Sequence, residues 1–571
     1  MVISMSKSDG ELFLAQNLTD EEREKIDDLE ILEVIIRYYG DISYLESPEY
    51  GNIKLVILLA GYAVAYVGVD ELEVLENAKG IIYIEKPRRL FYSVTYGRQV
   101  SCITQFQQKY RSSGGFGMGV ICSLVDSGID YSHPAFLDEN GRTRIIKLWD
   151  QSIEGNPPEG YLIGTVYSQE EINRAIEAGG TEKYNIVPSR DVSGHGTHVA
   201  GIMAGNFATD KKNNVGIATK SGIVAVKIGR SGTDIYPQTA ELMQGIDFII
   251  RESVKLNMPV AINLSLGNNY GSHDGTSLLE TYIDAASELW KCSVCVGTGN
   301  QGDSSIHAGG VVSDSEQNVG ISVGEFQRAF SVQLWKQYQD KMDIRIISPA
   351  GRVFYVSDSG EEIQNFTDNR NRIYVIYRNP VPYSIFQEIY IQFVPVNDYV
   401  DDGEWRIAIN PVRIKDGRYD LWLPSVDVLS SDTIFLKPDP NVTLTIPSTA
   451  NKVISVGGYN GRTMGMAEFS GRGFLRNLNF VKPDIVAPAV DIVSAEPGGG
   501  LSTRTGTSMA TPFVTGSAAL LMEWGIVNGN DAYMYGERLK AHLISGAEEL
   551  KGEETDRRRQ GWGRLCLSNS I

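Results

Sequence analysis

The sequence predicts an α/β protein built on a doubly wound parallel sheet, with an α+β domain in front of it and an all-β domain inserted into it. Three observations support this. From about 94 to 314, apolar strands alternate with helices. Residues 315–440 instead hold short alternating segments separated by turn residues, and the α/β pattern resumes over 441–571. Residues 1–93 form a separate unit by pattern.

The first unit, residues 1–93, mixes strands with one helix. ILEVIIRYYG is strand-like or mixed, and IKLVILLAGYAVAYVG contains two strands that meet near Gly61. DELEVLENAKG is an amphipathic helix and IIYIEKP is a closing strand. The segment PRRLFYSVTYG follows with a basic pair, aromatic residues and no period. We interpret it as an extended segment or linker.

The next part, 94–314, alternates strands and helices. Its strands are VICSLVDSG, GIVAVKIG, PVAINLSLG and CSVCVGTGN, and its clearest helix is QTAELMQGIDFIIRESVKLN. Apolar strands separated by helices predict a parallel sheet. The insert, 315–440, contains segments such as FSVQLW, RIYVIYR and YDLWLPS, which predict a β-sandwich or jelly roll.

Composition limits the partners of the chain. Its 571 residues exceed one ordinary core and predict two to four folded units. With 52 basic and 71 acidic residues, the net charge of −19 disfavours binding to nucleic acid. The longest apolar run, Leu55–Val69, is too short to span a membrane, and no signal peptide is visible. We therefore expect synthesis in the cytoplasm, no nucleic-acid partner and no membrane span.

The five cysteines are scattered and odd in number, and they do not suggest a disulfide-stapled secreted fold. Cys292 and Cys295 form a CxxC, but no second pair completes a zinc site. Because their flanks predict a buried strand, we interpret them as small buried thiols. No metal site is predicted from these residues.

Three short segments carry the chemistry. Asp126 ends the strand in LVDSGIDYSHP, His195 lies between glycines in SGHGTHVAGIMAG, and Ser508 stands at the mouth of the helix in TRTGTSMATPFVTGSAALLM. Each has a plain alternative: a turn cap, a metal ligand paired with His198, or an N-cap. Together they form the Asp, His and Ser that acyl transfer requires. His198 is interpreted as a structural histidine of the packed helix.

The motifs VDSGID, GHGTHVAG and GTSMATP closely resemble the signature segments of the subtilisin-like serine proteases, or subtilases. The resemblance covers about 94–310 and 445–571 and implies a subtilisin-like fold with Asp126, His195 and Ser508 as the catalytic triad. It also implies that Asn300, in VGTGNQG, donates to the oxyanion. The substrate cleft would be lined by Ser265, Leu266, Gly267, Gly229, Gly232, Gly297, Thr298 and Gly299. Arg230 and Asp234 would lie at the cleft edge.

The first unit resembles the family's propeptide, whose tail lies in the cleft and is cut autocatalytically. Aligning the tail places the cut among Leu90, Phe91, Tyr92, Ser93, Val94 and Thr95. An ordinary N-terminal interaction domain is the alternative. With the inserted jelly roll, the chain is most similar to the Csp-type germination proteases of clostridial spores. That resemblance implies limited proteolysis of a cortex-lytic zymogen and a location in the spore cortex or coat.

Two further functional classes stay open from the sequence: a restrained regulator or scaffold whose cleft is blocked by the propeptide, and a general degradative subtilase. The expected partners are a protein or peptide substrate and the chain's own propeptide bound in the cleft, and we expect a monomer. No cofactor is required for the chemistry. The loop GNFATDKKNNVGIA, with Asp210, Asn213 and Asn214 beside Lys211 and Lys212, is shorter than the family's calcium loop and leaves structural calcium open.

Overall fold

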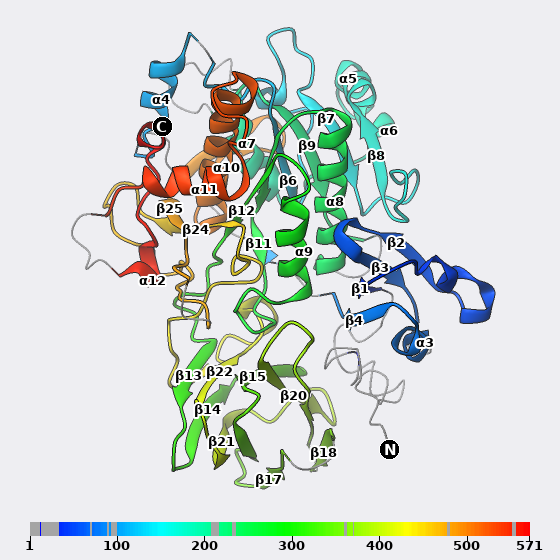
Figure 1. The fold of residues 1–571 in the computed structure, drawn as a ribbon, viewed down its shortest axis with the longest axis vertical. Helices are drawn as coiled ribbons and strands as arrows, with labels where there is room; N and C mark the ends of the chain where they lie inside the picture. The colour runs from blue at the N-terminus through cyan, green and yellow to red at the C-terminus, as the bar shows by residue number, and fades with distance from the viewer. Residues whose placement is uncertain are drawn as a thin grey trace. The chain divides into compact units, whose positions relative to one another are not determined.

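The computed structural model describes residues 12, 33–68, 71–87, 91–92, 100–112, 114–206, 216–230, 236–358, 362–368, 370–476, 480–550 and 556–571. The chain divides into two compact units, each made of several chain segments (Figure 1). One comprises Met1–Arg88, Asn268–Leu278 and Asp303–Val442. The other comprises Arg89–Gly267, Leu279–Gly302 and Thr443–Ile571, and we call it the catalytic unit.

The catalytic unit is built on an eight-stranded sheet of order β25-β24-β12-β10-β6-β9-β7-β8. Neighbouring strands in this sheet run parallel, except that β7 and β8 are antiparallel. The strands are β6 (Ile121–Asp126), β7 (Ile145–Asp150), β8 (Thr165–Ser168), β9 (Gly222–Lys227), β10 (Val260–Leu264), β12 (Cys292–Gly297), β24 (Ile454–Tyr459) and β25 (Ile485–Pro488). The predicted parallel α/β sheet is confirmed.

Helices cover both faces of this sheet. The helices are α4 (Ile103–Tyr110), α5 (Gln169–Ala178), α6 (Lys183–Ile186), α7 (His195–Ala204), α8 (Thr239–Lys255), α9 (Leu278–Ser287), α10 (Thr507–Met522), α11 (Gly536–Ser545) and α12 (Arg557–Gln560). Gly245 of α8 lies against Val125 and Val226 on one face. On the other face, Cys122 and Leu124 share a core with α7 and α10.

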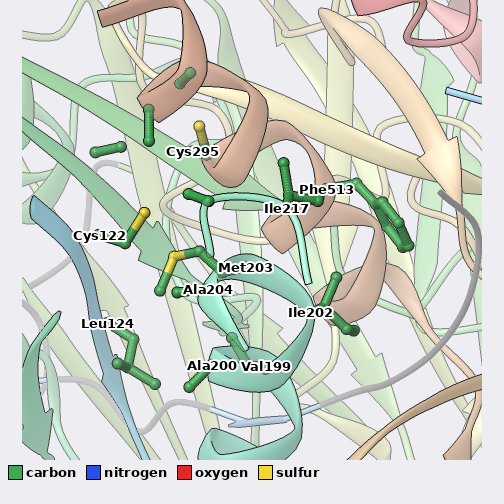
Figure 2. Packing of buried hydrophobic residues seen from close by; sticks show 14 of the residues in the cluster. Cys122, Leu124, Val199, Ala200, Ile202, Met203, Ala204, Ile217, Cys295 and Phe513 are labelled. Atoms are coloured by element: carbon green, nitrogen blue, oxygen red, sulfur yellow. The ribbon is translucent and has the colours of Figure 1, made fainter. Parts of the chain in front are cut away.

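The core between α7 and α10 is made of small and medium side chains (Figure 2). Ala200, Met203 and Ala204 of α7 belong to the same buried cluster as Ile217 and Phe513. A Cβ added to Gly516 of α10 would lie 2.7 Å from the Cβ of Ile217, so only glycine allows this approach. The stretch Thr507–Val527 is long and apolar enough for a membrane span, but 83% of its most apolar window is buried in the domain.

Two small pairs complete the catalytic unit. The hairpin β26 (Ile492–Glu496) and β27 (Gly500–Arg504) is antiparallel. The strand β5 (Phe91–Tyr92) pairs with β11 (Leu266–Gly267), which follows directly on β10.

The N-terminal part of the other unit is a four-stranded antiparallel sheet of order β2-β3-β1-β4. Its elements are β1 (Val34–Tyr38), β2 (Lys54–Ile57), β3 (Tyr62–Tyr66), α3 (Leu72–Asn77) and β4 (Ile81–Glu85). Gly61, with φ 76°, stands directly before β3, where the two strands were predicted to meet. The predicted α+β character of this segment is confirmed.

The insert is a sandwich of two sheets, of order β13-β22-β15-β20-β19-β18 and β17-β16-β21-β14-β23. Its strands are β13 (His307–Val311), β14 (Gln317–Val323), β15 (Phe330–Gln337), β16 (Lys341–Ile347), β17 (Val353–Val356), β18 (Ile363–Thr367), β19 (Asn371–Tyr377), β20 (Phe386–Pro395), β21 (Gly403–Arg413), β22 (Arg418–Trp422) and β23 (Ile434–Phe435). The sandwich therefore begins at His307, ahead of the predicted residue 315.

The sandwich and the N-terminal sheet share a hydrophobic core. Alternate residues of β19 and β20 point into the sandwich, among them Ile373, Val375 and Ile391. Their neighbours Tyr374, Ile376, Tyr390 and Val394 belong to the core of the N-terminal sheet instead. Both faces of these two strands are therefore buried. A period-2 pattern of apolar and polar residues predicts burial of one face only.

A disulfide joins Cys102 and Cys566 of the catalytic unit, with the two Cα atoms 4.8 Å apart. This pairing was not predictable from spacing, because 464 positions separate the two cysteines. The other three cysteines, Cys122, Cys292 and Cys295, are free and buried. The interpretation of Cys292 and Cys295 as buried thiols is confirmed, and burial raises the pKa of Cys295 to about 12.

Candidate active site

Asp126 and His195 form a close buried pair. Asp126 is the last residue of β6, and its Oδ1 lies 2.6 Å from Nδ1 of His195. Both side chains are almost completely buried. A carboxylate at this distance holds the proton on Nδ1 and leaves Nε2 as the atom that exchanges protons with a substrate or nucleophile.

Glycines on both sides of His195 make this approach possible. Gly194 is the N-cap of α7 and has φ 72°, in the left-handed region. A Cβ on Gly196 would collide with the carbonyl of Gly128 and would lie 3.0 Å from Oδ1 of Asp126. The glycines therefore make room for a neighbouring carboxylate and backbone.

Asp191 organises the turn before His195. Its Oδ1 accepts hydrogen bonds from the Gly194 N–H at 3.0 Å and the Ser127 hydroxyl at 2.8 Å. Its Oδ2 accepts from the Thr197 N–H and hydroxyl at 2.8 and 2.7 Å. Sequence reasoning missed this residue, because Asp191 lies three positions before the N-cap Gly194 and not at the N-cap, where a capping side chain is expected.

His198 has a structural role. It is completely buried, and its Nε2 lies 3.1 Å from the carbonyl oxygen of Ser502 in β27. Burial lowers the pKa of His198 from 6.5 to about 3, so the ring is neutral at physiological pH. It lies in the middle of a packed helix, as the sequence predicted.

Ser508 is the second residue of α10, directly after Thr507 and the N-cap Gly506. The first turn of a helix presents backbone N–H groups without intrahelical acceptors and carries the positive end of the helix dipole. The Ser508 hydroxyl donates to the carbonyl of Ser265 at 2.9 Å. The Ser265 hydroxyl donates in return to the carbonyl of Ser508 at 2.8 Å. This reciprocal pair ties the nucleophile candidate to the segment that precedes β11.

Asn300 lies beside the same helix start. Its Oδ1 accepts from the backbone N–H of Thr507 at 3.0 Å and from the Thr507 hydroxyl at 3.3 Å. Because the amide oxygen is held by Thr507, the NH₂ group is the end of the side chain that donates. A side-chain amide donor and helix-start N–H groups beside a serine are the components of an oxyanion hole.

The predicted processing segment pairs with the predicted substrate strand. Tyr92 is opposite Leu266 and Phe91 is opposite Gly267 in an antiparallel register. An extended peptide is thereby added to the edge strand β11, a common mode of peptide recognition. Leu90, Ser93, Val94 and Thr95 lie outside the described residues.

Thr445 supports two predicted walls of the cleft. A Cβ on Gly267 would lie 2.6 Å from its hydroxyl oxygen, and so would a Cβ on Gly299, which has φ 81°. The Thr445 N–H donates to the carbonyl of Thr298 at 3.0 Å. Gly297 lies close to Thr507 and Thr511 of α10. Sequence reasoning missed Thr445, because the inserted sandwich separates it from these walls in the chain.

The remaining predicted positions are spread over other parts of the unit. Gly229 has φ 137° and open space beside it, whereas Gly232 and Asp234 lie outside the described residues. Arg230 is not a solvated charge: its Nε lies 3.0 Å from Oε1 of the buried Glu241. The loop positions Asp210, Lys211, Lys212, Asn213 and Asn214 also lie outside the described residues.

Within the described ranges, one group of side chains is close enough to share a metal ion: Cys102, Glu548 and Cys566. Both sulfurs of this group are bonded to each other in the disulfide. This group therefore offers no metal site while the disulfide is formed, since a metal ligand must be a thiolate.

Comparisons with known proteins agree with this geometry. The sequence model of the subtilase family matches residues 117–377 and 435–563. The sequence model of the Csp protease B prodomain matches residues 6–88. The solved structure of the Clostridium perfringens CspB protease is 36% identical, with a TM-score of 0.76, and the match covers 83% of this chain and 96% of that one.

More distant relatives are proteases by name. The minor extracellular protease Vpr of Bacillus subtilis is 24% identical over 80% of this chain. The PII-type proteinase of Lactococcus lactis is 24% identical over 75% of this chain. The alignments span 52% and 24% of the length of these two relatives.

Proposed function

Since the chain belongs to the subtilase family of serine peptidases, with a Csp-type prodomain, we propose that it is an endopeptidase that cuts its own propeptide with Asp126, His195 and Ser508. The observation that carries this proposal is the 2.6 Å contact between Asp126 and His195 in the same unit in which the processing segment pairs with β11.

The proposed reaction is acyl transfer. The Ser508 hydroxyl gives up its hydrogen bond to the Ser265 carbonyl and transfers its proton to Nε2 of His195. The Ser508 Oγ then attacks the carbonyl carbon of the peptide bond. The Asn300 amide and the Ser508 N–H donate to the negative oxygen of the tetrahedral intermediate. His195 then protonates the leaving amine, and an acyl-enzyme forms on Ser508. Water hydrolyses this ester by the same steps in reverse order.

The strand register predicts which bond is cut. Tyr92, the last described residue of β5, lies opposite Leu266, and Ser265 comes directly before Leu266 in the chain. The Ser265 carbonyl accepts the Ser508 hydroxyl, so an extended peptide that continues one residue past Tyr92 would reach the nucleophile. We therefore expect cleavage between Ser93 and Val94, within the segment indicated by the sequence.

Self-cleavage is tested by comparing the purified wild type with Ser508→Ala on a denaturing gel. Wild type is expected to separate into a prodomain and a larger fragment, and Ser508→Ala is expected to stay intact at 62.9 kDa. Two intact proteins would contradict self-processing.

Labelling of the wild type, but not of Ser508→Ala, by a fluorophosphonate would identify the nucleophile. No labelling, before or after removal of the prodomain, would favour the alternative of a silent scaffold.

The cleaved propeptide is proposed to stay bound. Its sheet shares a hydrophobic core with Tyr374, Ile376, Tyr390 and Val394 of the sandwich, and breaking the peptide bond does not expose that core. The two fragments should elute together from a size-exclusion column, at the volume of a monomer. Separate elution would show that the propeptide leaves.

We propose limited proteolysis of a spore cortex-lytic zymogen, in the cortex or coat of the spore, as the physiological role. The prodomain match and the similarity to the CspB protease support it. The test is incubation of the processed protein with a purified cortex-lytic zymogen and, separately, with casein. A single cut in the zymogen with little casein hydrolysis supports this role. Extensive casein hydrolysis favours a degradative enzyme.

We propose that the chemistry needs no calcium, so the peptidase activity of the processed protein should persist in EDTA.

A further inference from the structure

Trp422 joins several chain segments inside the unit that contains the sandwich. Its ring is buried at the end of β22 and stacks with two histidine rings. The ring centroid of His273 is 4.2 Å away with an interplanar angle of 11°, and that of His307 is 4.8 Å away with an angle of 25°. The indole Nε1 donates to the carbonyl of Val442 at 3.1 Å. One side chain therefore contacts three separate stretches of chain.

The first stretch begins where the substrate strand ends. Asn268 follows Gly267 of β11 directly, and Nε2 of His273 lies 3.1 Å from the carbonyl of Asn269. The N–H of Gly271 donates to Oε1 of Gln333 at 2.8 Å. Gln333 is the cross-strand neighbour of Trp422 on β15. The chain that leaves β11 is thus fastened to Trp422 and to its neighbour.

The other two stretches adjoin Asn300 and Thr445. The chain continues from Asn300 to His307, which is the cross-strand neighbour of Trp422 on β13. Nε2 of His307 lies 3.2 Å from Asp420 on β22, and its Nδ1 lies 3.0 Å from the carbonyl of Asp439. On the return, Val442 precedes Thr443 and Thr445, the residue that contacts both Gly267 and Gly299.

We propose that Trp422 is a positioning residue for peptide hydrolysis, acting through His273, His307 and Val442 on the walls of the cleft. The inserted sandwich then has a role in the reaction, because it sets the conformation of the connections that run to β11, Asn300 and Thr445. A flat, rigid ring with a single donor suits this role, since it loses little side-chain entropy when it is fixed. The expected change in KM rests on the proposed protease function, whereas the expected change in hydrogen exchange does not.

The structural test is hydrogen exchange, measured by mass spectrometry in the Ser508→Ala background so that no variant is processed. The variants are His273→Ala, Trp422→Phe and His273→Phe, which keeps a flat ring against Trp422 but loses the Nε2 contact with Asn269. Trp405→Phe is the matched control, because Trp405 is equally buried in the sandwich and its Nε1 also donates to a backbone carbonyl, that of Asp401, at 2.8 Å.

We expect backbone amides in segments 264–268 and 298–302 to exchange at least about tenfold faster in His273→Ala and Trp422→Phe. His273→Phe and Trp405→Phe should stay within about threefold of the parent protein. Unchanged exchange in both His273→Ala and Trp422→Phe would overturn the proposal. An equal increase in Trp405→Phe would also overturn it, because the effect would then be general loosening of the sandwich.

The kinetic test uses the same variants with Ser508 present and Leu-Phe-Tyr-Ser-p-nitroanilide as substrate. A displaced β11 weakens the binding of the extended peptide, so His273→Ala should raise KM about tenfold and leave kcat within about threefold. A KM equal to that of the wild type, with an active wild type, would contradict the proposal. A wild type that cleaves nothing would count against the protease function instead, and hydrogen exchange would still decide the role of Trp422.

Discussion

At the scale of single residues, each chemical group of the site is held by a neighbour that fixes its orientation. Asp126 holds Nδ1 of His195, Thr507 holds the amide oxygen of Asn300, and Ser265 exchanges hydrogen bonds with Ser508. The sequence predicted the site residues because their motifs are local. It missed Asp191 and Thr445, because their contacts depend on how a turn closes and on where the chain returns after the insert.

Asn300 provides a direct test of the oxyanion site. Replacement by alanine removes the donating amide, and the loss of one such donor typically costs about 10²–10³ in turnover. Asn300→Asp retains an oxygen for the Thr507 N–H but presents a negative charge to the oxyanion, so it should lose at least as much. The rate of self-processing during cell-free synthesis, followed on a gel, measures both variants. Processing of either at the wild-type rate would remove Asn300 from the mechanism.

His198 should make stability depend on pH. Its pKa is about 3 in the folded protein and near 6.5 when unfolded, so between these values the unfolded chain binds more protons. The contribution to stability is complete above pH 6.5 and falls by about 1.4 kcal/mol for each pH unit below it. In the Ser508→Ala background, His198→Gln should therefore lose less stability than its parent on acidification. The free energy of unfolding in urea, measured at pH 7 and pH 5, tests this. An equal loss of stability in the parent and in His198→Gln would contradict the proposed role of His198.

At the scale of elements, the close approach of α7 and α10 depends on small residues. In the sequence, the small residues of the helix that holds His198 predict that this helix is packed. Other element features were not predictable. The strands β19 and β20 are buried on both faces because a second domain packs on them, and the start of the sandwich at His307 lies in a Gly-rich segment without a strand pattern.

Gly516 tests this helix contact. Gly516→Ala places a methyl group 2.7 Å from the Cβ of Ile217 and 3.0 Å from the carbonyl of Met203, and such overpacking costs about 1–3 kcal/mol. The free energy of unfolding in urea measures the loss. Gly500→Ala is the control, because a Cβ there meets nothing within 4 Å. A stability loss no larger than that of Gly500→Ala would mean that the helices are not in tight contact.

At the scale of the whole molecule, a disulfide joins the start of the catalytic unit to the C-terminal segment. Cys102 precedes α4, and Cys566 follows the last short helix, α12. Sequence reasoning could not pair them, because spacing carries no information across so long a loop. Apart from this bond, the order of the three parts and their fold classes were predictable, since each part has its own hydrophobic period.

The disulfide is tested by alkylation of the unfolded, unreduced protein followed by mass spectrometry. Three cysteines should react, namely Cys122, Cys292 and Cys295, and reduction should raise the number to five. Removing a bond that closes a long loop typically costs about 2–5 kcal/mol, so Cys102→Ser should unfold at lower urea concentration than its parent. Five reactive thiols before reduction would show that the bond does not form.

We propose that Ser508 cuts the chain's own propeptide directly after the segment in which β5 pairs with β11. The most direct measurement is intact-mass and N-terminal analysis of the purified wild type beside Ser508→Ala. We expect a wild-type fragment that begins at Val94 and a Ser508→Ala chain without that cut. A fragment that begins elsewhere would refute the strand register, and a Ser508→Ala chain cut at the same bond would refute self-processing.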